Sequence, residues 1–326
     1  MLRIFKLNDL SSAIALVFLT FVLKARYIWH PPALSEMDNF HRGLLFSFSG
    51  LARFYEKHPS IYVFFSVMIL FGFSIYFNYV VNRERFLQKK SYLPAMSFLL
   101  FSSFAPILNV FSTAFIANIF LFMAFSKTMQ LYQIAKPRKA CFDIGLLVSL
   151  ASLFYFPSIL FFFLFLALLL LLRPFVLEEN MAYIIGILTP IYLAFALVYL
   201  TGHWNDIGKL VFLQLTPPIK TMSVLPLVIM TVVSITMFVY GLFLVNQAGI
   251  KNAIAVRKKW NGVVLYFFFA CFIGIFAKNF PGVPWILTIT PISIILSQTF
   301  LNNKEKYNTF TFYFLLVAVL AIQWLL

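Results

Sequence analysis

Long apolar stretches recur along the whole sequence and constrain its fold more than any other feature. Two of them, 60–82 and 181–201, contain no charged side chain. Each is about as long as an α-helix must be to cross the roughly 30 Å hydrocarbon layer of a bilayer. Of the 326 residues, 62% are hydrophobic and 11% are charged, against roughly 45–50% and 25% in a soluble domain. The sequence therefore predicts an all-α, polytopic integral membrane protein.

About eleven segments qualify as membrane-spanning helices by this criterion. Polar stretches between them reach only about 30 residues, so we expect residues 1–326 to form a single transmembrane domain without a soluble catalytic module. Pro106 and Pro157 fall between consecutive spans and predict two tightly turned helix pairs. The predicted spans are 10–28, 60–82, 91–108, 110–127, 142–157, 158–173, 181–201, 222–246, 261–277, 283–300 and 308–326.

The formal net charge of +15 has two readings. A basic soluble protein would suggest a nucleic-acid partner, but the cytoplasmic loops of membrane proteins are themselves enriched in Lys and Arg. Most of the 25 Lys and Arg residues fall on one side of the predicted topology, near the N-terminus and around 83–90, 127–139, 251–259 and 304–306. We therefore expect no nucleic-acid binding, with the N-terminus inside and the C-terminus outside.

Two outer loops, 29–59 and 202–223, contain all the histidines. Within the first loop, apolar residues between Phe40 and Tyr55 recur at steps of three and four, which predicts a helix lying in the membrane interface. The second loop opens with His203 and Asp206. These two could form an acid–base or metal pair with the first loop, but no spacing motif supports this, and a histidine satisfied within its own loop is the better explanation.

The densest polar constellation lies in the first outer loop. Glu36 and Asp38 stand two residues apart, close to His41 and Arg42. One of these carboxylates could act as a catalytic general base, or could bind a divalent metal ion beside a phosphate group. The alternative is a solvated turn that caps the following helix. No other cofactor motif is recognisable in the sequence.

Arginines near this loop are candidate ligands for the phosphate of a lipid headgroup or lipid carrier, because a guanidinium pairs bidentately with phosphate. These residues are Arg26, Arg42 and Arg53; the alternative role is interfacial anchoring. Lys24 and Arg26 lie near the end of the first span, where long side chains can extend to the interface. Elsewhere the spans offer hydroxyls and a few amides, which argues against an ion-coupled pump or transporter. The basic run 257–259 could contact anionic lipid or a partner, although topology alone accounts for it.

Two resemblances extend these inferences. The segments "LVSLASLFYFPSILFFFLFLALLLLLRPF", "IIGILTP" and "STAFIANIFLFMAF" resemble a family of uncharacterised multi-span inner-membrane proteins of Bacteroidota, catalogued as a domain of unknown function. That resemblance implies a multi-pass protein of the bacterial inner membrane. It supplies no established activity and no functional residues.

The predicted architecture of about eleven spans, with an acidic pair after the first span and an interfacial helix in the first outer loop, is similar to GT-C-type glycosyltransferases. Those enzymes take sugars from polyprenyl-phosphate donors. The resemblance implies that Glu36 or Asp38 serves as base or metal ligand and that Arg42 and Arg53 bind carrier phosphate. The chain departs from that pattern because it lacks a soluble outer domain and a second acidic motif.

Two functional hypotheses follow. In the first, the chain is a GT-C-like protein that handles a lipid-linked substrate at the outer face of the membrane. In the second, it is a non-catalytic subunit or scaffold of a cell-envelope or secretion complex, where aromatic helix faces pack against partner helices. Membrane lipids are expected partners in either case.

Overall fold

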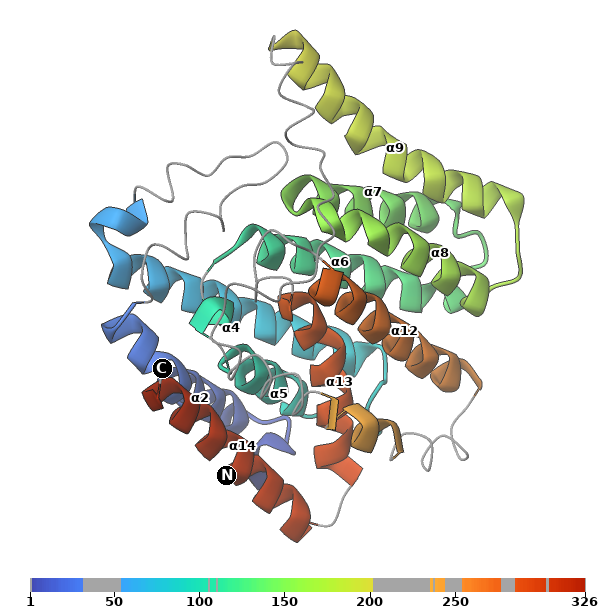
Figure 1. Cartoon of the computed structure of the whole chain (residues 1–326). Helices are drawn as coiled ribbons and strands as arrows, with labels where there is room; N and C mark the ends of the chain where they lie inside the picture. The colour runs from blue at the N-terminus through green and yellow to red at the C-terminus, as the bar shows by residue number, and fades with distance from the viewer. Residues whose placement is uncertain are drawn as a thin grey trace.

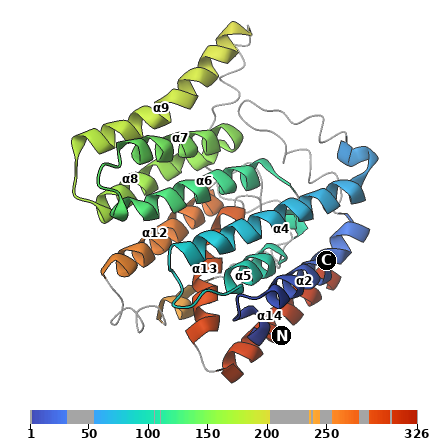
Figure 2. The same cartoon turned by 180° about the vertical axis from the view of Figure 1, so that it is seen from behind.

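The computed structural model describes residues 2–31, 54–104, 106–109, 111–201, 235–236, 238–243, 254–276, 285–302 and 305–325. The described part is helical and contains no strand (Figures 1 and 2). This confirms the all-α prediction. Its principal helices are α1 (Leu2–Phe5), α2 (Leu10–Trp29), α4 (Pro59–Arg83), α5 (Leu93–Ser102), α6 (Thr113–Gln130), α7 (Arg138–Phe154), α8 (Phe161–Leu172), α9 (Leu177–Leu200), α12 (Ile254–Phe276), α13 (Ile286–Asn302) and α14 (Glu305–Leu325).

Within the described residues, three helices, α2, α4 and α9, are long and apolar enough to cross a membrane. Their bounds agree with the predicted spans 10–28, 60–82 and 181–201 to within about four residues. Some of the other apolar helices are shorter: α5 has 10 residues and α8 has 12, whereas crossing a bilayer takes about 20. The total of about eleven spans and the orientation of the termini therefore stay predictions.

The helices are arranged in successive layers around α5 and α13 (Figure 1). All residues of α5 and those of α13 from Ile286 to Phe300 are buried. Helices α4, α6 and α12 pack around this pair, α2 and α14 lie on one side, and α7, α8 and α9 lie on the other. Phe73 of α4 makes edge contacts with Phe98, Phe115 and Phe122, at 5.2, 5.6 and 5.8 Å between ring centroids. Aromatic packing of this kind fills the bundle interior.

Both prolines that predicted tight turns interrupt the helices there. Pro106 begins the short 3₁₀ helix η2 (Pro106–Asn109) between α5 and α6. Pro157 lies in η4 (Phe156–Leu160) between α7 and α8. Ser112 then caps α6 by accepting a hydrogen bond from the Phe115 backbone N–H at 3.2 Å. These helix ends are therefore determined by residues close in sequence: a proline in each connection and a polar cap at the start of α6.

Ion pairs gather at one end of the bundle, where α6 and α8 end and α7 and α9 begin. Lys127 of α6 pairs with Asp143 of α7 at 2.5 Å. Arg173, directly after α8, pairs with Glu179 of α9 at 3.2 Å, and Arg138 pairs with Glu178. Three of the cations that the sequence predicts on one side of the membrane, Lys127, Arg138 and Arg173, therefore lie at this end of the bundle.

Candidate functional site

One of the five predicted site residues lies within the described part of the chain. Arg26 is partly buried in the last turns of α2. The predicted carboxylates Glu36 and Asp38 and the predicted phosphate ligands Arg42 and Arg53 lie outside the described residues. Most of the predicted interfacial helix and the whole second outer loop, with His203 and Asp206, also lie outside them.

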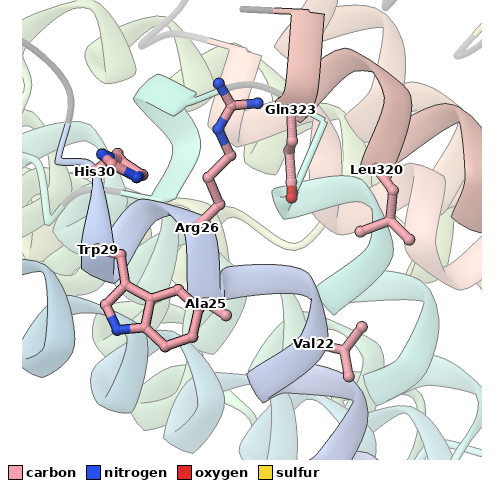
Figure 3. A pocket seen from close by; sticks show the side chains of 7 residues that line it. All are labelled: Val22, Ala25, Arg26, Trp29, His30, Leu320 and Gln323. Carbon is pink, nitrogen blue, oxygen red and sulfur yellow. The ribbon is translucent and has the colours of Figure 1, made fainter.

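Arg26 lines a pocket of about 380 Å³ between the C-terminal ends of α2 and α14. Figure 3 shows its side chain extending from α2 beside Gln323 of α14, with His30 nearby. Residues three, four, seven and eight positions apart lie on the same face of a helix. The lining residues from α2 have this spacing, so one face of α2 forms a wall of the pocket. The lining residues are Val22, Ala25, Arg26, Trp29, His30, Leu320 and Gln323. Among the described residues that line the pocket, Arg26 is the one permanently charged side chain, and its neighbours are mainly apolar.

Gln323 ties the helices around this pocket together. Its amide Nε2 donates to the backbone carbonyl of Leu23 at 2.8 Å and to that of Ser103 at 3.2 Å. The side chain is 3% exposed, and a buried amide without such acceptors would be costly. This one residue joins α14 to α2 and to the end of α5, so it fixes the spacing of the pocket walls.

Lys24 points away from the pocket and is fully buried. Its Nζ donates to Ser102 Oγ at 2.9 Å and to Asn109 Oδ1 of η2. The expectation that Lys24 extends to the membrane interface is therefore wrong. The physical reason is that Ser102 at the end of α5 and Asn109 in η2 place side-chain oxygen acceptors beside α2, within reach of the lysine amine.

The contacts of Lys24 are unusual because both partners are neutral. Ser102 and Asn109 are themselves fully buried, and neither supplies a negative charge to the lysine. Ionisable residues inside a membrane helix are costly and usually mark function. Lys24 therefore joins Arg26 as a second basic group at this end of α2, on a different helix face.

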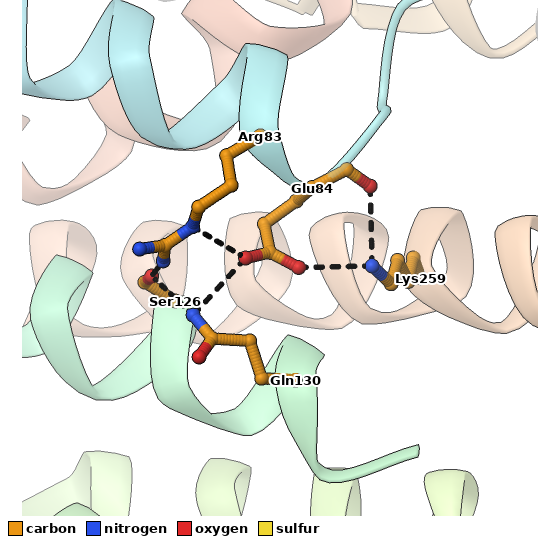
Figure 4. A network of polar contacts seen from close by, with 5 residues as sticks. All are labelled: Arg83, Glu84, Ser126, Gln130 and Lys259. Atoms are coloured by element: carbon orange, nitrogen blue, oxygen red, sulfur yellow. Dashed lines mark hydrogen bonds and ion pairs between the residues drawn. The ribbon is translucent and has the colours of Figure 1, made fainter. Parts of the chain in front are cut away.

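A second polar network lies at the opposite end of the bundle, where α4 ends (Figure 4). Lys259 of α12 donates to Glu84 Oε2 at 2.9 Å and to the Glu84 carbonyl oxygen at 3.1 Å. Gln130 donates to Glu84 Oε1 at 3.0 Å, and Arg83 Nε lies 3.1 Å from the same oxygen. Glu84 and Lys259 are 5% and 7% exposed. The network joins α4, α6 and α12.

The basic run 257–259 divides between the interior and the surface of the bundle. Lys259 is buried against Glu84, so it is not free to contact lipid or a partner, whereas Arg257 is exposed. Helical periodicity accounts for the difference, since residues two apart lie on nearly opposite faces.

Metal ligation has no support within the described residues, where no three His, Cys, Asp or Glu side chains gather. The proposed metal ligands Glu36 and Asp38 lie elsewhere in the chain. Cys141 and Cys271 are free thiols on separate helices.

No protein-family model, curated protein or solved structure matches this chain. The two family resemblances therefore stay predictions, and the functional argument rests on the geometry described above.

Proposed function

We propose that this chain is an integral membrane protein that binds the phosphate-bearing headgroup of a lipid or lipid carrier in the pocket between α2 and α14. The observation that carries the proposal is the position of Arg26 in a pocket otherwise lined mainly by apolar side chains. A guanidinium suits a phosphate oxygen pair, and apolar walls suit the first carbon atoms of a lipid chain.

The location of the pocket supports a lipid ligand over a soluble one. It lies at the end of α2, which is one of the helices long and apolar enough to cross a membrane. An arginine within the last turn of such a helix lies near the depth of lipid headgroups. We place the chain in the bacterial inner membrane as a multi-pass protein, with this end of α2 at the outer face.

The acidic pair extends the proposal toward GT-C-like catalysis. Glu36 follows His30 by six residues, so an extended chain cannot carry it more than about 21 Å from the pocket rim. We propose that Glu36 or Asp38 takes a proton from an acceptor hydroxyl. As oxygen ligands, the same carboxylates would hold a divalent ion, which would make that hydroxyl more acidic. The acceptor oxygen then bonds to the sugar carbon, and the bond from that carbon to the carrier phosphate breaks.

The binding step is tested by native mass spectrometry of the detergent-purified full-length chain. It is titrated with polyprenyl phosphate and with the matching polyprenol, which has the same hydrocarbon and no phosphate. We expect Arg26→Gln to weaken polyprenyl-phosphate binding about 10- to 100-fold, since charged hydrogen bonds contribute about 1.5–3 kcal/mol. Lys139→Gln, which removes an exposed cation from the first turn of α7, serves as the control and should change nothing.

The catalytic step is tested separately with the Glu36→Ala, Asp38→Ala double variant. Retained lipid binding with lost sugar transfer supports the transferase. Equal binding of polyprenol and polyprenyl phosphate by the wild type overturns the headgroup site. Stoichiometric protein partners retained by every variant, without such a lipid, leave the alternative of a structural subunit in an envelope or secretion complex.

A further inference from the structure

The connection between α4 and α5 presents a rigid basic surface at the opposite end of α2 from the Arg26 pocket. Arg85, Lys89 and Lys90 are exposed, whereas Phe86 and Leu87 between them are 3% and 6% exposed. The two apolar residues anchor the connection in the bundle and leave the three cations outside. Because α4 ends at Arg83, the cations lie where a membrane-capable helix leaves the bilayer.

Hydrogen bonds and ring contacts fix the shape of this connection. Asn82 and Ser91 bond each other twice, from Asn82 Nδ2 to the Ser91 carbonyl at 2.9 Å and from the Ser91 N–H to Asn82 Oδ1 at 3.2 Å. Phe86 stacks on Phe125 and meets the edge of Trp260, at 6.2 and 5.8 Å between ring centroids. The cations therefore stand on a preorganised surface, which lowers the entropic cost of binding a ligand.

The backbone at Arg85 is itself unusual. Among the described residues, Arg85 is the one non-glycine residue with positive φ, at 56°. Such a conformation is uncommon for a residue with a Cβ and persists where the surroundings enforce it. Arg85 directly follows the buried Glu84. The chain therefore turns at this point with the Glu84 side chain inside the bundle and the Arg85 side chain outside.

Glu84, directly before Arg85, is held by Lys259 and Gln130. Asp143, Glu178 and Glu179 each pair with a cation elsewhere in the bundle, and Asp9, directly before α2, is exposed. None of these carboxylates pairs with Arg85, Lys89 or Lys90. A further lysine, Lys6, lies close by, because the Tyr92 N–H donates to the Phe5 carbonyl at 2.9 Å. The surface therefore carries a local excess of positive charge.

We propose that the 85–90 surface is a binding site for the headgroup of an anionic phospholipid. A phosphate at the membrane surface has the complementary charge, and each Lys or Arg near an anionic membrane contributes about 1 kcal/mol. A lipid headgroup can approach the cations and the exposed backbone of this turn while its hydrocarbon chains remain beside α4. This site is separate from the Arg26 pocket and does not depend on it.

The test compares two charge-matched double variants of the full-length protein in detergent by native mass spectrometry. Lys89→Gln, Lys90→Gln removes two exposed lysines of this surface. Lys136→Gln, Lys139→Gln removes two exposed lysines at the same end of the bundle, one just before α7 and one in its first turn. Phosphatidylglycerol is the probe, and phosphatidylcholine with the same chains is the neutral comparison.

We expect the wild type to prefer phosphatidylglycerol and the Lys89, Lys90 variant to bind it about 10- to 30-fold more weakly, with little change in the Lys136, Lys139 variant. Polyprenyl-phosphate binding at the Arg26 pocket should be unchanged in both. If the double variant fails to fold, Arg85→Asn, which tolerates positive φ, carries the same test with a smaller loss, about 5-fold.

Three results would overturn the proposal. One is an equal loss in both double variants, which would indicate diffuse charge attraction. Another is the absence of any preference for phosphatidylglycerol. The third is a protein that co-purifies with the wild type and is lost from the Lys89, Lys90 variant while lipid binding is unchanged, which would assign the surface to a protein partner.

Discussion

Lys24 of α2 donates a 2.9 Å hydrogen bond to Ser102 at the end of α5, and both side chains are fully buried. This bond brings the first membrane-capable helix to the point where the α5–α6 pair turns. Asn109 accepts a second bond from the same Nζ. The lysine therefore links α2, the end of α5 and η2.

Ser102→Ala should destabilise the fold through Lys24. The substitution removes one acceptor from a buried amine, which costs about 1–3 kcal/mol. In a Lys24→Met background the same change should cost at least about 1 kcal/mol less, because no buried N–H is then left unpaired. Equilibrium unfolding in mixed micelles measures both values. Additive losses would show that the Lys24–Ser102 bond contributes nothing of its own.

Gly145→Ala and Gly186→Ala should each destabilise the contact between α7 and α9. A Cβ on Gly145 would overlap the Tyr183 carbonyl oxygen, and a Cβ on Gly186 would overlap the Phe142 carbonyl oxygen. The two backbones must then separate, and we expect a loss of about 1–3 kcal/mol.

Gly72→Ala is the control for these glycine variants. Gly72 lies in α4, and an added Cβ meets no atom within 4 Å. Alanine has the higher helix propensity, by up to about 1 kcal/mol, so this variant should be neutral or slightly stabilised in a thermal unfolding assay. Equal losses at all three glycines would contradict a specific α7–α9 contact.

Local features of the sequence were enough to predict α2, α4 and α9 but not the polar contacts of the bundle. The uncharged stretch 60–82 predicted α4 (Pro59–Arg83) almost to the residue, because length and hydropathy fix a membrane-capable helix. Pro106 and Pro157 marked the breaks, because proline removes a backbone donor wherever it falls.

The contacts of the candidate site depend on residues far apart in the chain. Gln323 bonds the carbonyl of Leu23, 300 positions away, and Lys259 bonds Glu84 across 175 positions. No periodicity within one helix specifies which element lies opposite. Lys24 was misread for the same reason, since its burial depends on α5 ending beside it. One signal was present for Gln323, which is an amide in an otherwise apolar C-terminal stretch.

Lys259→Met should destabilise the bundle more than a comparable change at an exposed pair. It leaves the buried carboxylate of Glu84 with Arg83 and Gln130 as its remaining partners, and breaking a buried ion pair costs about 3–5 kcal/mol. We expect about 2–4 kcal/mol, because those partners compensate in part. Lys127→Met, at a pair whose side chains are 42% and 30% exposed, should cost about 1 kcal/mol or less. Denaturant unfolding of the two variants compares them directly, and similar losses would show that burial adds nothing at Glu84.

Leu320→Trp should block the pocket between α2 and α14 without changing any charge. Leu320 lines the pocket from α14, one turn before Gln323, so a larger indole ring there occupies space that a lipid chain would need. We expect the binding of polyprenyl phosphate to fall at least about 10-fold while Arg26 remains in place. Leu320→Ala enlarges the same wall and should retain binding. Native mass spectrometry with the two substitutions separates a ligand held inside the pocket from one attracted only to the charge of Arg26, because only the first is sensitive to the size of residue 320.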